Sequence, residues 1–188
     1  MVIDAGHGGI DGGSEGSISK VKESKLNLEI AVKLKKSLEK VGFIVIMTRE
    51  SDVGLYGDTS DGFKVRDLKK RVQIINENKP DLAVSIHLNK YSKEYRRGAQ
   101  VFYSKNNSIS KNLANDIQFY LNLLKESKKM YDALIGDYYI LNNSNSPAVI
   151  VECGFLSNNE EEKLLQESSY QTKLADAITN GILKFLST

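Results

Sequence analysis

The sequence contains few of the residues that most often build metal and cofactor sites. Among its 188 residues are one cysteine, two histidines, two prolines and no tryptophan. A single cysteine excludes an internal disulfide and any cysteine-rich zinc module. No apolar run approaches the roughly 20 residues that a membrane-spanning helix needs. Any functional site in this chain must therefore depend on a small number of well-placed side chains.

The charge of the chain is close to balanced. Lys and Arg number 26 against 24 Asp and Glu, which gives a net charge of +2 at pH 7. Because the two signs are interspersed, the sequence predicts no nucleic-acid surface. The 40% hydrophobic and 27% charged residues are ordinary for a globular protein. No repeat or Pro-rich linker divides the chain, so residues 1–188 are expected to form one domain.

The periodicity of apolar residues predicts alternating strands and helices. The expected strands cover residues 2–5, 43–47, 82–87, 99–103, 138–141 and 148–151. Helix-like spacing marks residues 25–40, 65–75, 113–124 and 174–185. Several strands are apolar throughout, which is typical of a parallel sheet covered on both sides. We therefore expect a single-domain α/β fold, with a largely parallel twisted sheet of about six strands and helices on both faces.

The first expected strand begins so early that no signal peptide precedes it. Such an abrupt start is typical of a trimmed chain, and we expect an export or anchor segment upstream of residue 1.

Three strand ends carry side chains that bind metals or move protons. His7 and His87 each follow an apolar run, and Glu152 follows the run Ala148-Val149-Ile150-Val151. A lone histidine in such a position is more often a loop residue than a ligand. In open α/β sheets, however, ligands bind outside the carboxyl ends of the strands. Together the three residues predict one metal-hydrolase site.

A zinc hydrolase needs three protein ligands and one open position for water. It also needs a separate carboxylate that accepts the proton of that water. Glu152 provides one carboxylate, and Glu23, just before the first helix, is the natural second. Spacing alone does not favour Glu23 over Glu15 or Asp11, and a glutamate at a helix start also complements the helix dipole.

Several other patterns have simpler interpretations. The stretch 12–16 matches G-x-S-x-G, but its serine lies in a loop rather than on a strand-to-helix elbow. Asp11 stands where a dinucleotide fingerprint requires glycine. Strand alternation turns Cys153 away from Glu152, which predicts a core residue rather than a fourth ligand. Asp4 is expected to brace the loop after the first strand.

The motifs in combination resemble the zinc-dependent N-acetylmuramoyl-L-alanine amidases of bacterial cell walls. The resemblance covers nearly the whole chain in order. It rests on residues 4–13, 23–28, 66–76, 85–89 and 147–158, which include Asp-Ala-Gly-His-Gly-Gly and Glu-Cys-Gly-Phe-Leu-Ser-Asn. Ala5 replaces a proline of many relatives, and residues 130–143 lack the basic residues that many autolysins carry there. These features are most similar to the spore-cortex amidases.

The resemblance implies a single catalytic amidase domain with a zinc ion bound by His7, Glu23 and His87. It implies that Glu152 is the catalytic carboxylate, and that the amide between the lactyl group of N-acetylmuramic acid and L-alanine is cleaved. It further implies a peptidoglycan substrate and formation of muramic-δ-lactam in the spore cortex. The expected location is outside the cytoplasm, in the cell wall or the spore intermembrane space, with a lipoprotein as a candidate partner.

Two other functions remain open on the sequence. One is a peptidoglycan-binding module that depends on a partner and has little activity alone. The other is a zinc peptidase that cleaves within the stem peptide.

Overall fold

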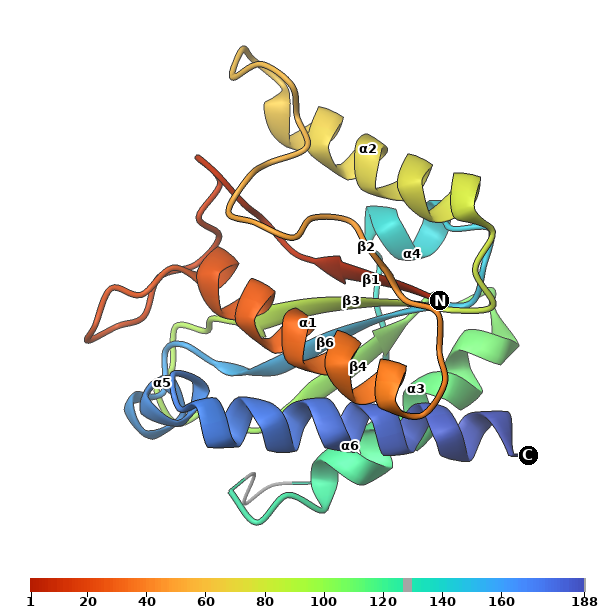
Figure 1. Ribbon diagram of the computed structural model, residues 1–188. Coiled ribbons are helices and arrows are strands. Elements are labelled where there is room, and N and C mark those ends of the chain that lie inside the picture. Colours follow the sequence, from red (N-terminus) through yellow and green to blue (C-terminus); the bar gives the residue numbers. More distant parts are fainter. Residues whose placement is uncertain (127–129, 188) are drawn as a thin grey trace.

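The computed structural model describes residues 1–126 and 130–187, and a six-stranded sheet lies at its centre (Figure 1). The strands are β1 (Val2–Ala5), β2 (Ile46–Met47), β3 (Ala83–Asn89), β4 (Gln100–Tyr103), β5 (Leu134–Ile135) and β6 (Ala148–Phe155). The helices are α1 (Glu23–Lys40), α2 (Phe63–Asn78), α3 (Ser108–Asn122), α4 (Tyr139–Asn143), α5 (Asn159–Leu165) and α6 (Ser168–Leu186). In this part of the chain, no helix is both long and apolar enough to span a bilayer.

The sheet has the order β2-β1-β3-β6-β4-β5. The first four of these strands run parallel, β4 is antiparallel to β6, and β5 is parallel to β4. This topology confirms the expected α/β fold with a largely parallel sheet. It also brings the carboxyl ends of β1, β3 and β6 together at one end of the sheet, which we call the carboxyl edge.

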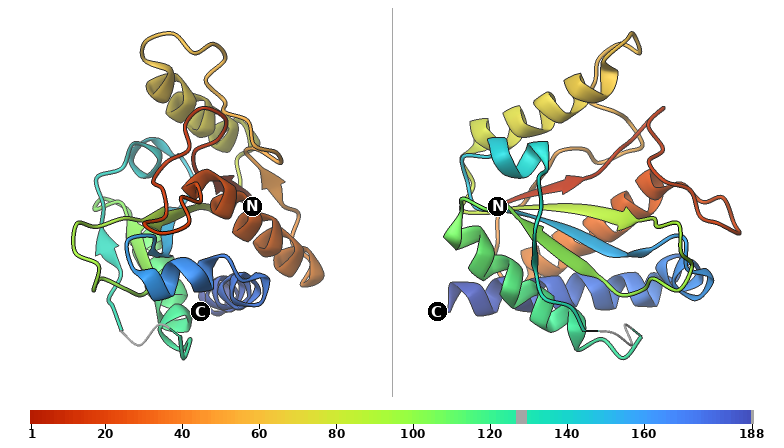
Figure 2. Two further views of the ribbon diagram at one scale, coloured as in Figure 1. Left: turned by 90° about the vertical axis from the view of Figure 1, so that its left-hand side faces the viewer. Right: turned by 180° about the vertical axis from the view of Figure 1, so that it is seen from behind.

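Helices cover both faces of the sheet (Figures 1 and 2). Helices α1, α3 and α6 pack together on one face, where they bury the larger apolar core. Helices α2 and α4 cover the other face over a smaller core. Strand alternation divides β3 and β6 between the two cores, because successive side chains point to opposite faces. Val149 and Val151 thus belong to the larger core and Ile150 to the smaller one.

The face beneath α2 changes from apolar to polar along the strands. On β3 it begins with Ala83, continues with Ser85 and ends with His87. On β6 the positions paired with them lead from Ala148 through Ile150 to Glu152. This gradient leaves the reactive side chains at the carboxyl edge of a well-packed sheet.

Two expected strands are wrong in extent or type. Only Ile46 and Met47 of the 43–47 run pair with β1, and Ile44 is 85% exposed, because β2 lies at the edge of the sheet. The 138–141 run is not a strand, since α4 begins at Tyr139 and buries Ile140 and Leu141 against the smaller core. Short apolar runs do not distinguish a strand from a buried helical turn. The short elements β5 and α5 were not anticipated.

Candidate metal centre

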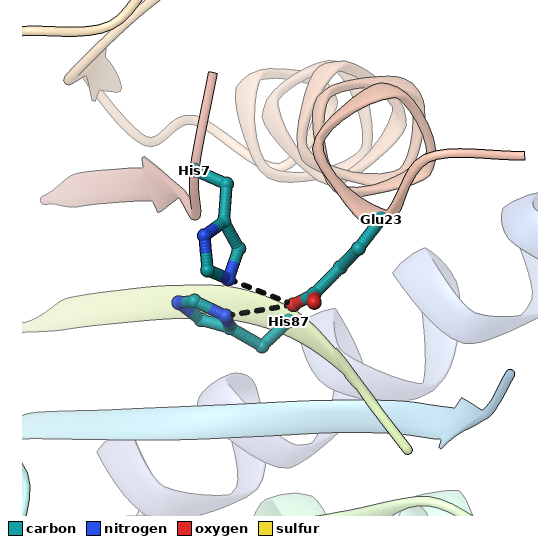
Figure 3. Close-up of side chains that lie close together, drawn as sticks. All are labelled: His7, Glu23 and His87. Carbon is teal, nitrogen blue, oxygen red and sulfur yellow. Dashed lines mark hydrogen bonds and ion pairs between the residues drawn. The ribbon is translucent and has the colours of Figure 1, made fainter. Parts of the chain in front are cut away.

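His7, Glu23 and His87 come together at the carboxyl edge of the sheet from three separate elements (Figure 3). His7 follows β1, His87 belongs to β3, and Glu23 is the first residue of α1. Glu23 Oε1 lies 3.2 Å from His7 Nε2 and 3.0 Å from His87 Nδ1. One ligand atom from each residue lies within 4.8 Å of the others, so the three could bind one metal ion. The predicted convergence of His7, Glu23 and His87 is therefore present.

The Glu23 carboxylate is buried and fixed by hydrogen bonds. Its Oε2 accepts from the Ser14 backbone N–H at 2.8 Å, and its Oε1 accepts from the Leu88 N–H at 3.2 Å. Burial raises the pKa of Glu23, but hydrogen bonds and charge from the two imidazoles outweigh burial and hold that pKa well below its usual range. Glu23 is therefore ionised and positioned for a cation.

Asp11 orients His7 rather than joining the group of three. Its Oδ2 lies 2.8 Å from His7 Nδ1, which leaves Nε2 facing Glu23. Burial lowers the pKa of His7, yet hydrogen bonds to Glu23 and Asp11 raise it to about 9 overall. The imidazole therefore carries a positive charge in the metal-free chain, and a bound metal ion would replace its proton. The exposed Glu15 lies outside the group, so of the three acids Glu23 is the one that the fold brings to both histidines.

Two glycines provide the space in which these side chains meet. A Cβ on Gly6 would lie 2.3 Å from the His87 ring. A Cβ on Gly13 would lie 2.6 Å from Glu23 Oε2 and 2.7 Å from the His7 ring. Gly13 also has φ +68°, in the left-handed region that glycine tolerates best. The glycine-rich loop therefore allows close approach of the backbone to the centre.

Two buried arginines fix the loop after β1, and sequence reasoning did not identify them. Arg71 of α2 donates to Asp4 Oδ1 at 2.6 Å, to the His7 carbonyl at 2.6 Å and to Asp67 Oδ2 at 2.5 Å. Arg49 donates to the backbone carbonyls of four residues: Ala5, Gly6, Ser24 and Ser51. The spacing of Asp67 and Arg71 (i, i+4) was the available sequence signal. Asp4 braces this loop as expected, through Arg71.

Glu152 lies next to this centre on β6, where its Cα pairs with that of His87. The residue is 9% exposed, and its Oε2 has no hydrogen-bond partner within the described residues. Burial raises the pKa of Glu152 to about 7; Glu23 adds to the rise and His87 opposes it. A carboxylate with this pKa exchanges protons near neutral pH, as a general base must.

The alternative interpretations of nearby residues are settled by the same geometry. Cys153 is completely buried in the larger core, on the face opposite Glu152, which confirms its prediction as a core residue. Ser14 lies in the loop between β1 and α1, as expected, and its backbone binds Glu23. Tyr138 packs edge-on against Phe102 at 5.4 Å between ring centres.

Comparison with known proteins identifies the class of this site. The family model described as N-acetylmuramoyl-L-alanine amidase matches residues 1–184. The chain belongs to this amidase family. The amidase is 36% identical to the germination-specific N-acetylmuramoyl-L-alanine amidase of Bacillus subtilis over 195 residues, which cover 100% of the chain and 79% of that relative.

Solved structures agree with the family assignment. The CwlD amidase from Clostridioides difficile, in complex with the GerS lipoprotein, is 41% identical with a TM-score of 0.93. That match covers 99% of the amidase and 97% of the CwlD chain. An N-acetylmuramoyl-L-alanine amidase from Clostridium difficile 630 is 33% identical with a TM-score of 0.87, and covers 100% and 96% of the two chains. The amidase is therefore a hydrolase with the α/β fold of its relatives.

Proposed function

We propose that residues 1–188 are one catalytic domain that hydrolyses the lactyl–L-alanine amide of peptidoglycan with the help of zinc. The observation that carries this proposal is the cluster of His7, Glu23 and His87 beside the buried Glu152. In this assignment the first three residues bind the metal ion and Glu152 is the catalytic carboxylate.

The donor set fits zinc. Two imidazoles and one carboxylate are a ligand combination found in catalytic zinc sites, where a fourth position stays open. The ligand atoms already converge, and His7 is oriented by Asp11, as histidine ligands generally are by a carboxylate or carbonyl. When bound, zinc supplies a Lewis acid that polarises a carbonyl and lowers the pKa of water.

In this proposal Glu152 moves the proton of the reaction. Its buried Oε2 is free to accept a proton from the attacking water, and its pKa near 7 allows it to release that proton again. Glu152 then transfers this proton to the nitrogen of L-alanine. The C–N bond breaks on protonation, because a neutral amine is a better leaving group than its anion. One carboxylate thus serves as base and then as acid.

The biological setting is proposed from the named relatives. The germination-specific amidase of Bacillus subtilis supports a role in spore germination. For this chain we propose action on the spore cortex, with removal of stem peptides before formation of muramic-δ-lactam. Cell wall amidases among the relatives support action outside the cytoplasm. The complex of the CwlD amidase with a lipoprotein supports a lipoprotein partner for this chain.

The test separates the chemistry from metal binding. We expect Glu152→Gln to lower the rate of stem-peptide release by about 10²- to 10⁴-fold, which is the usual contribution of a general acid–base group. Zinc content, measured by plasma mass spectrometry, should stay at the wild-type level. His87→Ala is the matched variant and should lose both zinc and activity. Wild-type rates in Glu152→Gln would remove this residue from the mechanism.

A binding module that needs a partner is the second candidate, because a similar structure was solved as a complex with a lipoprotein. Zinc affinity and peptide release should be measured for the chain alone and with a candidate partner. An inactive isolated chain that gains zinc and activity with the partner would favour this candidate. Mass analysis of the products separates both from a zinc peptidase, because only an amidase leaves a free lactyl carboxylate on the sugar.

A further inference from the structure

A cavity of about 210 Å³ opens beside the two histidines, on the sheet face beneath α2. Its walls come from α2 and from the segment that leads into α4. The apolar part of the lining consists of Leu68, Tyr138, Tyr139, Ile140 and Ile150. His7 and His87 belong to its lining, so a group inside the cavity would adjoin the proposed metal ion.

The polar groups on the floor of this cavity already have partners. Asp4 accepts from Arg71 on Oδ1 and from the Ser85 hydroxyl on Oδ2, at 2.6 Å each. Arg71 is also bound to Asp67. Hydroxyl-rich ligands would lose hydrogen bonds to water here without replacing them, which is costly. The cavity therefore favours small apolar groups over sugar rings.

The volume of the cavity also favours small peptide groups over sugar rings. Pockets that enclose a drug-sized ligand measure about 300–1,000 Å³, so this cavity accepts one or two amino-acid residues. A glycan strand is a polymer and must lie on the open surface. Of the two sides of the scissile amide, the peptide side, which begins with the methyl group of L-alanine, matches the cavity.

Lys64 adds a charge to the rim of this cavity. It lies in the first turn of α2, and its side chain is 66% exposed. Its Nζ is 3.4 Å from Asp11 Oδ1, on the side of Asp11 away from His7. The arginine of the lining, Arg71, is buried and engaged by Asp4 and Asp67. Of these two basic side chains, Lys64 is thus the one that a substrate carboxylate can reach.

We propose that this cavity binds the first two residues of the stem peptide and that Lys64 is a specificity-determining residue for the second of them. Lys64 favours a free α-carboxylate at that residue over the carboxamide found in amidated cell walls. The proposal rests on the amidase function proposed above and adds a substrate preference to it.

The experiment compares two product-like inhibitors, L-alanyl-D-glutamate and L-alanyl-D-isoglutamine, each blocked as the γ-methylamide so that they differ only at the α-carboxyl group, during cleavage of purified peptidoglycan. The wild-type protein should bind the free acid about fivefold more tightly than the amide, which is the scale of an exposed ion pair. Lys64→Met should bring the ratio of the two inhibition constants close to one. Lys69→Met changes an exposed lysine of the same helix that lies outside the cavity lining, and it should keep the wild-type ratio.

The outcomes separate this proposal from the function on which it rests. Equal ratios in the wild-type and Lys64→Met proteins would overturn the role of Lys64 while leaving the amidase reaction intact. Absence of any peptide release would contradict the proposed function instead. Calorimetric titration with the same two dipeptides then still measures the preference, and a ratio unaffected by Lys64→Met would again overturn it.

Discussion

At the scale of single residues, the chain places charged side chains in its buried interior, where charges are rarely found. Asp4 and Arg71 are each at most 2% exposed, yet they form an ion pair beside the candidate metal centre. Buried pairs of this kind tolerate the loss of one partner poorly, because the other is left uncompensated. Their position, with Arg71 also bound to the His7 carbonyl, links the stability of the sheet to the geometry of the site.

Asp4 makes the free energy of unfolding depend on pH. Burial raises the pKa of Asp4, but Arg71, Ser85 and Thr48 lower it more, to about 2 from 3.8. Because the folded value lies below the unfolded one, the stabilisation is complete above about pH 4 and is lost as pH falls through about 2. We expect a loss of about 2 kcal/mol in the free energy of unfolding, measured by urea denaturation across this range.

Carbon NMR of the carboxyl groups checks the same prediction directly. The Asp4 signal should titrate near pH 2, and a midpoint at or above 3.8 would contradict the stabilising role of Arg71. Asp81→Asn alters an exposed aspartate and should leave the pH profile unchanged.

The sequence predicts the meeting of some candidate site residues and not of others, for physical reasons. His7, His87 and Glu152 stand at the ends of apolar runs, and parallel strands place such ends together. Spacing does not show whether Glu23 or Asp11 is the second carboxylate of the site. The two acids are joined by a glycine-rich loop, and its sequence does not reveal which of them folds back toward the histidines. Arg71 was missed for a related reason: its hydrogen bonds to backbone carbonyls exist only once the strands are assembled.

At the scale of elements, the loop between β1 and α1 is the part on which the centre most depends. It carries His7, presents Glu23 at the first turn of α1 and passes the backbone close to both. Sequence patterns anticipated this loop and the long helices, since long periodic segments give a strong signal. They failed at the short runs 43–47 and 138–141, where burial in the assembled fold decides the conformation.

Gly13→Ala tests the packing of this loop. The new Cβ would press on Glu23 and His7, so we expect zinc affinity to fall about 10- to 100-fold, as for changes around metal ligands. Gly57→Ala is a matched control, because Gly57 also has a positive φ of 75° but open space around its Cβ position.

Both glycine variants should lose about 1 kcal/mol of stability through the left-handed backbone, and only Gly13→Ala should lose zinc. Competition with a fluorescent chelator measures the affinities. Wild-type affinity in Gly13→Ala would show that the loop yields without disturbing the ligands.

At the scale of the whole molecule, one edge of the sheet gathers residues from α1, β3, β6 and the loop after β1. Their separation in sequence means that the centre forms only when most of the fold is present. A metal ion that binds here binds the folded state alone, and such binding stabilises by mass action.

We therefore expect zinc at a concentration 100 times its dissociation constant to add about 2.7 kcal/mol to stability. For a domain of this size, that corresponds to a rise of roughly 5–10 °C in Tm. Calorimetry of the chelator-treated and zinc-loaded protein measures the shift. His87→Ala should show no shift, and identical melting curves for the two wild-type samples would argue against a metal site.

The alternation of β6 also has an evolutionary meaning. Adjacent codons specify Glu152, which lies beside the candidate metal centre, and Cys153, which faces the larger apolar core. Selection for catalysis and selection for a stable fold therefore act on adjacent residues of β6. A mutant library that randomises all codons of β6 together would not separate these two kinds of selection. A library that varies every second codon would test each of them by itself.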